Sequence, residues 1–323
     1  MVITLGHEFR EEVLPVIKLA QRALLGKTKE LAVNSAHGVA FHRGLGTPLH
    51  PTSSTPLNKY LHEDSIADFA DSAYAKDNIA IVVNGAKLSE LSRWVGQFFG
   101  EAPGTAPSSG PKLESPATKY YGGEERIAHD SGNAMVIAFP GSSSFTAGSS
   151  YKPEISVLAA LLGGQSSIKW SPGFSLLGRR AASHASAHVA TTHSEYSDAG
   201  LLAITLTGGA SDIRGASGEV VKALKGVAAG ETSKEDLKKA IALAKFRALD
   251  AGQDITAGLE LTGAGLVQGG KAFQMDEIAK KVDGVTADQL KKVTPLMSTY
   301  GTCAVAHSRM TADDVCAGCS GTH

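Results

Sequence analysis

The sequence contains 323 residues, of which 42% are hydrophobic and 20% are charged, and its formal net charge is −1. These values predict a globular protein of about two domains and exclude the basic surface that binds nucleic acid or an anionic membrane. No run approaches the roughly 18 consecutive apolar residues that a membrane-spanning helix needs. All three cysteines lie after residue 302, so a disulfide framework is not expected.

Helices dominate the first 100 residues. Apolar residues recur at helical spacing within residues 9–25, and two shorter helices are expected over 28–38 and 63–74. The last of these begins on two acidic residues, which suit the positive end of a helix dipole. The apolar run Ile79–Val83 then predicts a buried strand, and a closing helix with one apolar face is expected from Leu88 to Phe98.

A linker follows at residues 101–119, which read EAPGTAPSSGPKLESPATK. This stretch holds four of the twelve prolines of the chain, with glycine and serine between them. Proline at this density interrupts both helices and strand ladders, so the stretch predicts an extended linker between two folded units.

The region after the linker alternates between strand and helix patterns in an order typical of an α+β fold. Pro153 and Gly163 suit the first turn and the cap of one helix. Capping boxes at Thr232 and Thr286 mark the starts of two others. We expect strands at 121–128, 134–139, 183–193, 201–207 and 301–306, and helices at 153–162, 212–228, 233–250, 255–269 and 286–297. This order predicts a mixed or antiparallel sheet with helices packed on one face.

An internal repeat relates the two units. Residues 286–306 repeat the helix–strand pattern of residues 62–82 without a gap, at an offset of 224 residues. Repeats at a fixed offset indicate duplicated units, here about 220 residues long. Because the second unit begins near Tyr120, the first is expected to begin about 105 residues before Met1.

Histidine spacing gives no metal site. His184 and His188 are four residues apart on an expected strand, which would separate them by about 13 Å. His37, His42 and His50 lie in a helix end and a loop without a fixed mutual geometry. His7 and Glu8 could begin a zinc-peptidase motif, but position 11 is glutamate where His-Glu-x-x-His needs histidine. Neither that motif nor the inverted His-x-x-Glu-His occurs anywhere in the chain. We therefore assign no catalytic, cofactor-binding or metal-binding residue and no cofactor.

Three further patterns have simpler interpretations. Gly263-Ala-Gly265 resembles half of a dinucleotide fingerprint, but no strand precedes it and position 268 is glutamine, which favours helix packing. Asp198 could act as a catalytic acid, although a turn-forming role before Ala-Gly is simpler. The tail pair Cys316 and Cys319, followed by His323, has metal-like spacing, for which Cys303 or His307 would have to supply a further ligand. A frayed tail with an accidental cysteine pair is the simpler interpretation.

Several short segments in a fixed order resemble one superfamily. Tyr120–Glu124 (YYGGE), Leu161–Gly164 (LLGG) and Tyr196–Leu201 (YSDAGL) are similar to segments of the pitrilysin-type metallopeptidase superfamily, over residues 7 to 307. That superfamily includes insulinases, mitochondrial processing peptidase and the core proteins of ubiquinol–cytochrome c reductase, and the resemblance is greatest to the fungal core 2 family. It implies two homologous halves of metallopeptidase-like fold.

The resemblance also implies a division of the chain. The rear part of the first half would occupy residues 1–100, the linker 101–119 and the complete second half 120–307, with a tail of uncertain structure at 308–323. The zinc motif of the family lies on an early helix of the first half, which corresponds to residues before Met1. Its second-half equivalent, residues 151–162, carries no metal ligand.

The function implied is that of a noncatalytic core subunit of complex III, on the matrix side of the mitochondrial inner membrane. Its implied partners are core protein 1 and other complex III subunits, with no nucleic acid, no direct membrane span and self-association through exposed edges in isolation. The alternative is a zinc-dependent processing or insulinase-like peptidase, or its noncatalytic partner subunit. Ser167, Lys169 and Trp170 replace glycines of the loop with which that partner subunit grips presequences, which favours the core protein.

Overall fold

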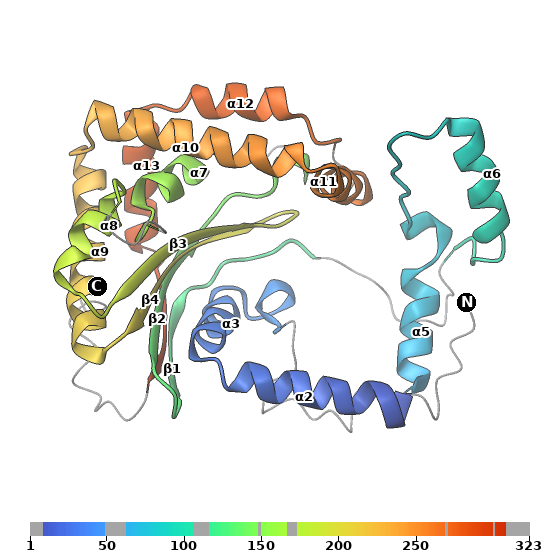
Figure 1. Ribbon diagram of the computed structural model, residues 1–323, viewed down its shortest axis with the longest axis horizontal. Coiled ribbons are helices and arrows are strands. Elements are labelled where there is room, and N and C mark those ends of the chain that lie inside the picture. Colours follow the sequence, from blue (N-terminus) through green and yellow to red (C-terminus); the bar gives the residue numbers. More distant parts are fainter. Residues whose placement is uncertain are drawn as a thin grey trace.

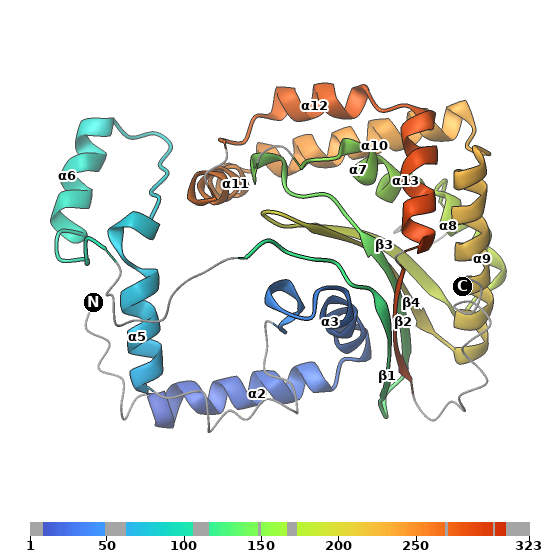
Figure 2. The same cartoon turned by 180° about the vertical axis from the view of Figure 1, so that it is seen from behind.

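The structure, a computed structural model, describes residues 9–48, 63–105, 116–147, 150–166, 173–268, 271–299 and 301–307. One five-stranded sheet lies at the centre of the larger part, with helices on both of its faces (Figures 1 and 2). Helices α5 (Glu63–Ala73) and α6 (Leu88–Phe98) lie to one side of this part, beyond the end of α2 (Leu14–Leu25). The expected α+β fold is thus confirmed.

The strands of the sheet follow the order β1-β5-β2-β4-β3. Strand β1 runs parallel to β5, and the three other pairs are antiparallel. Their bounds are Gly123–Ala128 for β1, Asn133–Pro140 for β2, His188–Glu195 for β3, Gly200–Gly208 for β4 and Thr302–His307 for β5. Four of the five strands expected after the linker are confirmed to within two residues at each end.

Strand β3 begins later than expected, at His188 instead of residue 183. The turn η5 (Ala181–Ser183) and its cap His184 occupy the start of the alternating stretch. Ser186 explains the difference, because its backbone N–H and hydroxyl donate to Asp212 at 2.9 and 2.5 Å and hold a turn there. A contact with a residue 26 positions away has overridden the local alternation.

The strand expected at Ile79–Val83 is not formed. The segment is extended but carries no strand assignment, and Ile81 and Val83 are 38% and 44% exposed. A strand needs a neighbour to receive its backbone hydrogen bonds, and none of the described residues pairs with this segment. The short helix η3 (Lys76–Asn78) joins it to α5.

Helices fill most of the chain outside the sheet. The expected helix 9–25 begins as a π-helical turn, η1 (Phe9–Val13), before α2, and α3 (Thr28–Phe41) extends three residues beyond the expected end. After the linker lie α7 (Pro153–Leu162), α8 (Leu176–Arg180), α9 (Ala210–Ala229), α10 (Lys234–Gln253), α11 (Ile255–Val267), α12 (Met275–Asp283) and α13 (Ala287–Thr299), with short 3-10 turns at η2 (Gly44–Gly46) and η4 (Phe145–Ala147).

Helix ends follow the expected chemistry with one shift. Thr286 and Gln289 form the expected reciprocal cap of α13, with Thr286 N–H donating to Gln289 Oε1 at 2.8 Å. Helix α10 is capped by Ser233, one residue after the expected Thr232. Helix α12 was not expected, although Ile278 and Val282, four residues apart, form its buried face.

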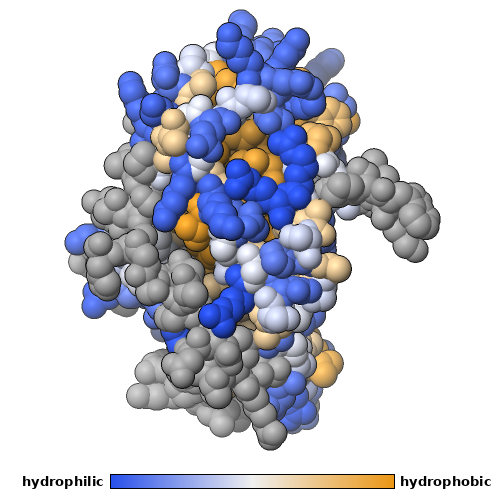
Figure 3. All heavy atoms as spheres, turned by 90° about the vertical axis from the view of Figure 1, so that its left-hand side faces the viewer, coloured by the Kyte–Doolittle hydropathy of each residue, from blue (hydrophilic) through white to orange (hydrophobic). Residues whose placement is uncertain are grey.

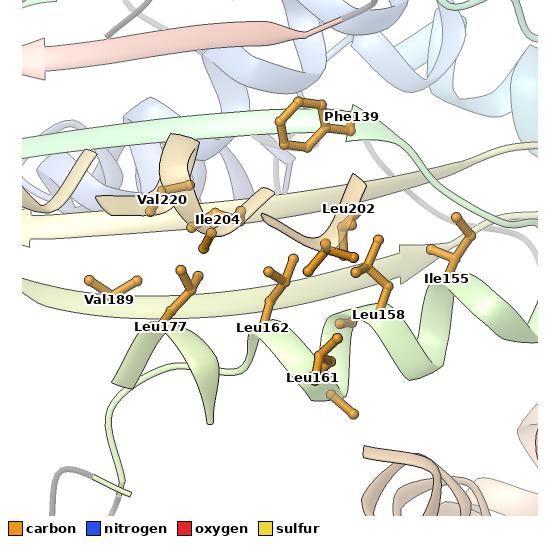
Figure 4. Packing of buried hydrophobic residues seen from close by; sticks show 14 of the residues in the cluster. Phe139, Ile155, Leu158, Leu161, Leu162, Leu177, Val189, Leu202, Ile204 and Val220 are labelled. Atoms are coloured by element: carbon orange, nitrogen blue, oxygen red, sulfur yellow. The ribbon is translucent and has the colours of Figure 1, made fainter. Parts of the chain in front are cut away.

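Large apolar side chains fill the space between the sheet and the helices α7, α9, α10, α12 and α13. Figure 4 shows Leu158 and Leu162 of α7 pointing toward Leu202 and Ile204 of β4. All four side chains are fully buried, and fully burying one leucine or isoleucine stabilises the fold by about 1.5–3 kcal/mol. The sequence predicted helices packed on one face of the sheet, and α7, α9, α10, α12 and α13 confirm this on the face that carries the large apolar side chains.

The opposite face of the sheet is covered by α3, from the part of the chain before the linker. This face carries mainly alanine, because alternate strand residues point to opposite sides. Helix α3 meets it with a stripe of alanines four residues apart, Ala32, Ala36 and Ala40. Small residues on both surfaces allow close approach of helix and sheet. The face consists of Ala134, Val136, Ala138, Leu201, Ala203, Ala304 and Ala306.

We predict that Ala36→Leu destabilises the protein by about 1–3 kcal/mol, because added methylenes overpack a closely packed contact. Ala36 is 0% exposed. Urea unfolding measures the change. Lys29→Leu, which places the same side chain at an exposed position of the same helix, should change stability by less than about 0.5 kcal/mol. Equal effects of the two substitutions would contradict the packing of α3 on the sheet.

Candidate functional site

Helix α7 occupies the place where the resemblance puts the second-half equivalent of the zinc helix. Pro153 sits in its first turn, and Gly163, with a positive φ of 57°, caps its end, as expected. Seven of its ten residues are buried and apolar, so the helix serves the core. Its sequence PEISVLAALL offers one carboxylate, Glu154, and no histidine.

The sequence candidates for metal binding do not converge. Within the described residues, no group of three or more His, Cys, Asp or Glu side chains could hold a metal ion. Both ring nitrogens of His37 are engaged, with Val33 O and the Tyr196 hydroxyl, each at 2.8 Å. His42 packs its ring against Tyr121. His7, His50, Ser167, Lys169, Trp170, Cys316, Cys319 and His323 lie outside the described residues, while Cys303 is buried.

Two other candidates have structural surroundings. Gly265 lies inside α11, where an added Cβ would collide with the carbonyl oxygen of Lys271, which agrees with helix packing. Asp198, at the tip of the β3–β4 hairpin, accepts hydrogen bonds from the N–H and hydroxyl of Thr118 at 2.7 and 2.9 Å. Its carboxylate thus holds the end of the linker against the hairpin.

The chain contains a cavity of about 470 Å³ beside α7 and β3. Pattern reasoning missed it, because its walls come from six elements separated by up to 138 residues. Aromatic and aliphatic side chains form most of the lining, and hydroxyl, imidazole and charged groups form the rest. The residues that line it are Ser144, Phe145, Tyr151, Ser156, Ala159, Thr191, Thr192, His193, Glu195, Ala244, Arg247, Ala248, Leu261, Phe273, Ile278 and Val282.

His193 is a well-enclosed polar residue of the cavity, with 7% of its side chain exposed. Its Nε2 accepts the backbone N–H of Ser142 at 3.0 Å, so the proton of the neutral ring resides on Nδ1. Nδ1 faces both Ser156 Oγ, at 3.4 Å, and Glu195 Oε1, at 3.3 Å.

This arrangement does not activate a nucleophile. A serine hydrolase needs the serine and the carboxylate on different ring nitrogens, with the nitrogen that faces serine free to accept its proton. Here Ser156 and Glu195 share Nδ1, which carries a proton, and Nε2 is occupied by the backbone N–H of Ser142. The histidine therefore holds the cavity wall together.

Tyr151 forms another wall of the cavity. Burial, and secondarily the negative charge of Glu195, raise the pKa of Tyr151 to about 12. Its ring packs edge-on against Phe145, with centroids 5.5 Å apart. The hydroxyl therefore remains protonated at neutral pH and acts as a hydrogen-bonding group.

Exposed apolar side chains gather on helices away from this sheet core. The face over α9 is mostly hydrophilic around scattered hydrophobic side chains (Figure 3). On α2 and α6, by contrast, no residue is buried. The exposed large apolar side chains of α2, α5, α6 and α11 are Val16, Leu19, Phe69, Leu88, Trp94, Phe98, Ile255, Leu266 and Val267. Patches of this kind mark surfaces for docking to other polypeptides.

Residues 60–243 match the family described as the Peptidase M16 inactive domain, which is more than half of the chain. The chain belongs to this family. Its place within the M16 inactive-domain family agrees with an α7 that carries no metal-ligand set.

Several proteins similar to this chain share one name. The chain is 49% identical, over 88% of its length, to "Cytochrome b-c1 complex subunit 2, mitochondrial" of Neurospora crassa, and it spans 61% of that protein. It is 32% identical, over 93% of its length, to the protein of the same name from Cryptococcus neoformans, and spans 67% of it. The chain thus spans about two thirds or less of the length of these relatives.

The fold is found in a solved complex. A chain of complex III2 from Candida albicans, with Inz-5 bound, superposes with a TM-score of 0.71, covering 90% of this chain and 70% of that one at 15% identity. At this identity the likeness shows the fold alone. Separately, none of the described helices is long and apolar enough to cross a membrane.

We predict that Tyr151 makes folding sensitive to alkaline pH. The pKa of Tyr151 is near 10 in the unfolded chain and about 12 in the folded chain. Its contribution to the free energy of unfolding is therefore complete below about pH 10 and is lost between about pH 10 and 12. Unfolding midpoints across this range should fall less steeply in Tyr151→Phe than in the wild type. Tyr120, whose pKa burial also raises to about 12, gives a matched variant, Tyr120→Phe, with an additive effect. An unchanged slope in Tyr151→Phe would contradict the burial of its hydroxyl.

Proposed function

We propose that the chain is a noncatalytic structural core subunit of the mitochondrial ubiquinol–cytochrome c reductase complex, equivalent to core protein 2. The 49% identity to the Neurospora crassa subunit over 88% of the chain carries this proposal. The partners would be core protein 1 and other complex III subunits, and the location would be the matrix face of the mitochondrial inner membrane.

The noncatalytic role is supported by the residues at the two places where chemistry could occur. The inward face of α7 packs into the hydrophobic core. In the cavity, Ser156 and Glu195 face the same ring nitrogen of His193, so the histidine does not activate the serine as a nucleophile. The family is described as an inactive domain. A zinc-dependent processing peptidase, or its noncatalytic partner subunit, is the alternative.

We also propose that residues 1–100 are part of a first half and residues 120–307 a second half, joined by the linker 101–119, with 308–323 as a tail. The repeat supports this division, because α5 and the extended Ile79–Val83 correspond to α13 and β5 at the offset of 224. The same offset moves α3 onto residues 252–265, within three residues of α11 at each end.

This correspondence explains the exposed surfaces. Helix α3 covers the sheet that contains β5, and α11 lies beside the extended segment, with Gly263 facing a methyl group of Val82. Helix α11 of the second half and the extended segment of the first half thus lie together, while no described residue pairs with that segment as a strand. An apolar helix and an unpaired strand are surfaces on which polypeptides associate.

The complex III proposal is tested by placing the tagged chain, behind a mitochondrial presequence, in a Neurospora crassa strain whose own subunit 2 is deleted. We expect the chain to migrate with complex III on native gels. Leu158→Asp, which puts a charge into the core, should be imported but not assembled. A folded, imported chain that never joins the complex would refute the proposal, and chelator-sensitive presequence cleavage by the purified chain would favour the peptidase.

We predict that the chain alone associates with itself through the exposed apolar helices. Trp94 and Phe98 stack on α6 with ring centroids 5.4 Å apart, at 48% and 65% exposure. Light scattering after size exclusion should show a mass that rises with concentration, and the variant Trp94→Gln/Phe98→Gln should lower it. Phe174→Gln removes an equally exposed ring on a different part of the surface and serves as the control. A monomer at all concentrations would refute the prediction.

A further inference from the structure

The buried part of the 470 Å³ cavity is apolar. Five side chains, from η4, α7, α10 and α12, line the cavity and are at most 5% exposed. They are Phe145, Ala159, Ala244, Ile278 and Val282, and we call them the cavity floor. The volume is within the range of about 300–1,000 Å³ that is typical of pockets for small molecules. The floor therefore suits the apolar part of a ligand.

A positive charge without a partner lies in the exposed part of the lining. Arg247 of α10 follows Ala244 by three residues, so it lies on the face of the helix that contributes to the floor, but it is itself exposed. Among the described residues, its guanidinium forms no ion pair or hydrogen bond. A guanidinium binds a carboxylate through two parallel hydrogen bonds, so Arg247 is available to an anionic headgroup.

The acidic residue of the lining is already engaged. Glu195 Oε1 accepts a hydrogen bond from the Ser156 hydroxyl at 3.3 Å and lies 3.3 Å from Nδ1 of His193. A further cation, Lys281, lies with its Nζ 5.2 Å from the centroid of the Phe145 ring. The cavity thus offers a cation to a ligand while its carboxylate is occupied. One free guanidinium matches a single negative charge, whereas a doubly charged phosphate would also be repelled by Glu195.

The lining also holds a hydrogen-bond donor that is not used. Thr191 lines the cavity, and its Oγ1 is buried and makes no hydrogen bond within the described residues. Buried hydroxyl groups in folded proteins nearly always have a partner. A ligand oxygen, directly or through a water molecule, would satisfy this one.

We propose that this cavity binds a single-chain amphipathic carboxylate, of the fatty-acid type, with its chain against the cavity floor and its carboxylate at Arg247. Burial of the chain provides the affinity, and the unpaired guanidinium selects the negative headgroup. This binding site goes beyond the structural role proposed above and does not depend on assembly into complex III.

The test uses the full chain with ¹³C-labelled isoleucine methyl groups, titrated with octanoate, decanoate and dodecanoate below the concentrations at which they form micelles. We expect the methyl resonance of Ile278, assigned with Ile278→Val, to shift and saturate. Because each buried CH₂ adds hydrophobic free energy, the Kd should fall about fourfold per added CH₂ until the chain exceeds the cavity. Decanol and decylammonium, which lack the negative charge, should bind at least about fivefold more weakly than decanoate.

Protein variants locate the headgroup and the chain. Arg247→Gln should weaken decanoate binding at least about fivefold and leave decanol binding unchanged, a difference that a general loss of structure would not produce. Arg214→Gln, at an exposed arginine of α9, is the matched control and should change neither affinity. Ala248→Trp, which fills part of the cavity, should weaken the binding of decanoate and decanol alike.

Three outcomes would overturn the proposal. The first is no saturable shift of the Ile278 methyl group at millimolar decanoate, and the second is equal affinity for decanoate, decanol and decylammonium. The third is a set of shifts confined to Ile81 and Ile255, which are 38% and 65% exposed and would report adsorption to the outer apolar surfaces. Because the ligand series is measured on the unaltered protein, the proposal remains testable even if a variant fails to fold.

Discussion

The close packing of α3 on the alanine face of the sheet is the contact on which the rest of the fold depends. Strands β2, β4 and β5 sort their side chains by size, with large residues toward α7 and α9 and small residues toward α3. This sorting lets helices cover both faces of one sheet. It also packs α3, which precedes the linker, against strands that follow the linker. The sheet would otherwise expose a face made largely of alanine.

Comparison with this contact explains why α11 and the segment Ile79–Val83 are exposed. Helix α11 and the extended Ile79–Val83 are related by the repeat to α3 and β5, yet they have no sheet between or beside them in the described residues. Ile255, Leu266 and Val267 of α11 face solvent, whereas Ala32, Ala36 and Ala40 of α3 are fully buried. One sequence pattern therefore has two physical outcomes, decided by the presence of neighbouring strands.

The site beside α7 shows which interactions hold a peptidase-like fold together around a helix that carries no metal-ligand set. Buried leucines and alanines on α7 strengthen the core, and the neutral His193 ring bridges a backbone N–H to Ser156 and Glu195. Both features stabilise the wall of a cavity and leave no activated group in it. Apolar side chains of α2, α6 and α11 remain exposed to solvent.

The sequence by itself determined the features that depend on near neighbours along the chain. Helix α7 with its proline start and glycine cap, the Thr286–Gln289 capping box and the strand bounds of β2 and β4 could all be predicted, because local periodicity and caps set them. The order of short family segments likewise predicted the fold and the family.

Only the tertiary structure decided features that require distant partners. Residues 79–83 have the composition of a buried strand but pair with no other strand among the described residues. The Ser186–Asp212 contact delays β3, and α3 covers a sheet whose strands all come much later in the chain. The cavity and the tautomer of His193 also arise from elements far apart in sequence. All of these features have the same physical reason. A strand needs a partner for its backbone hydrogen bonds, a buried face needs a surface to pack against and a buried polar group needs a hydrogen-bond partner, and here distant segments supply them.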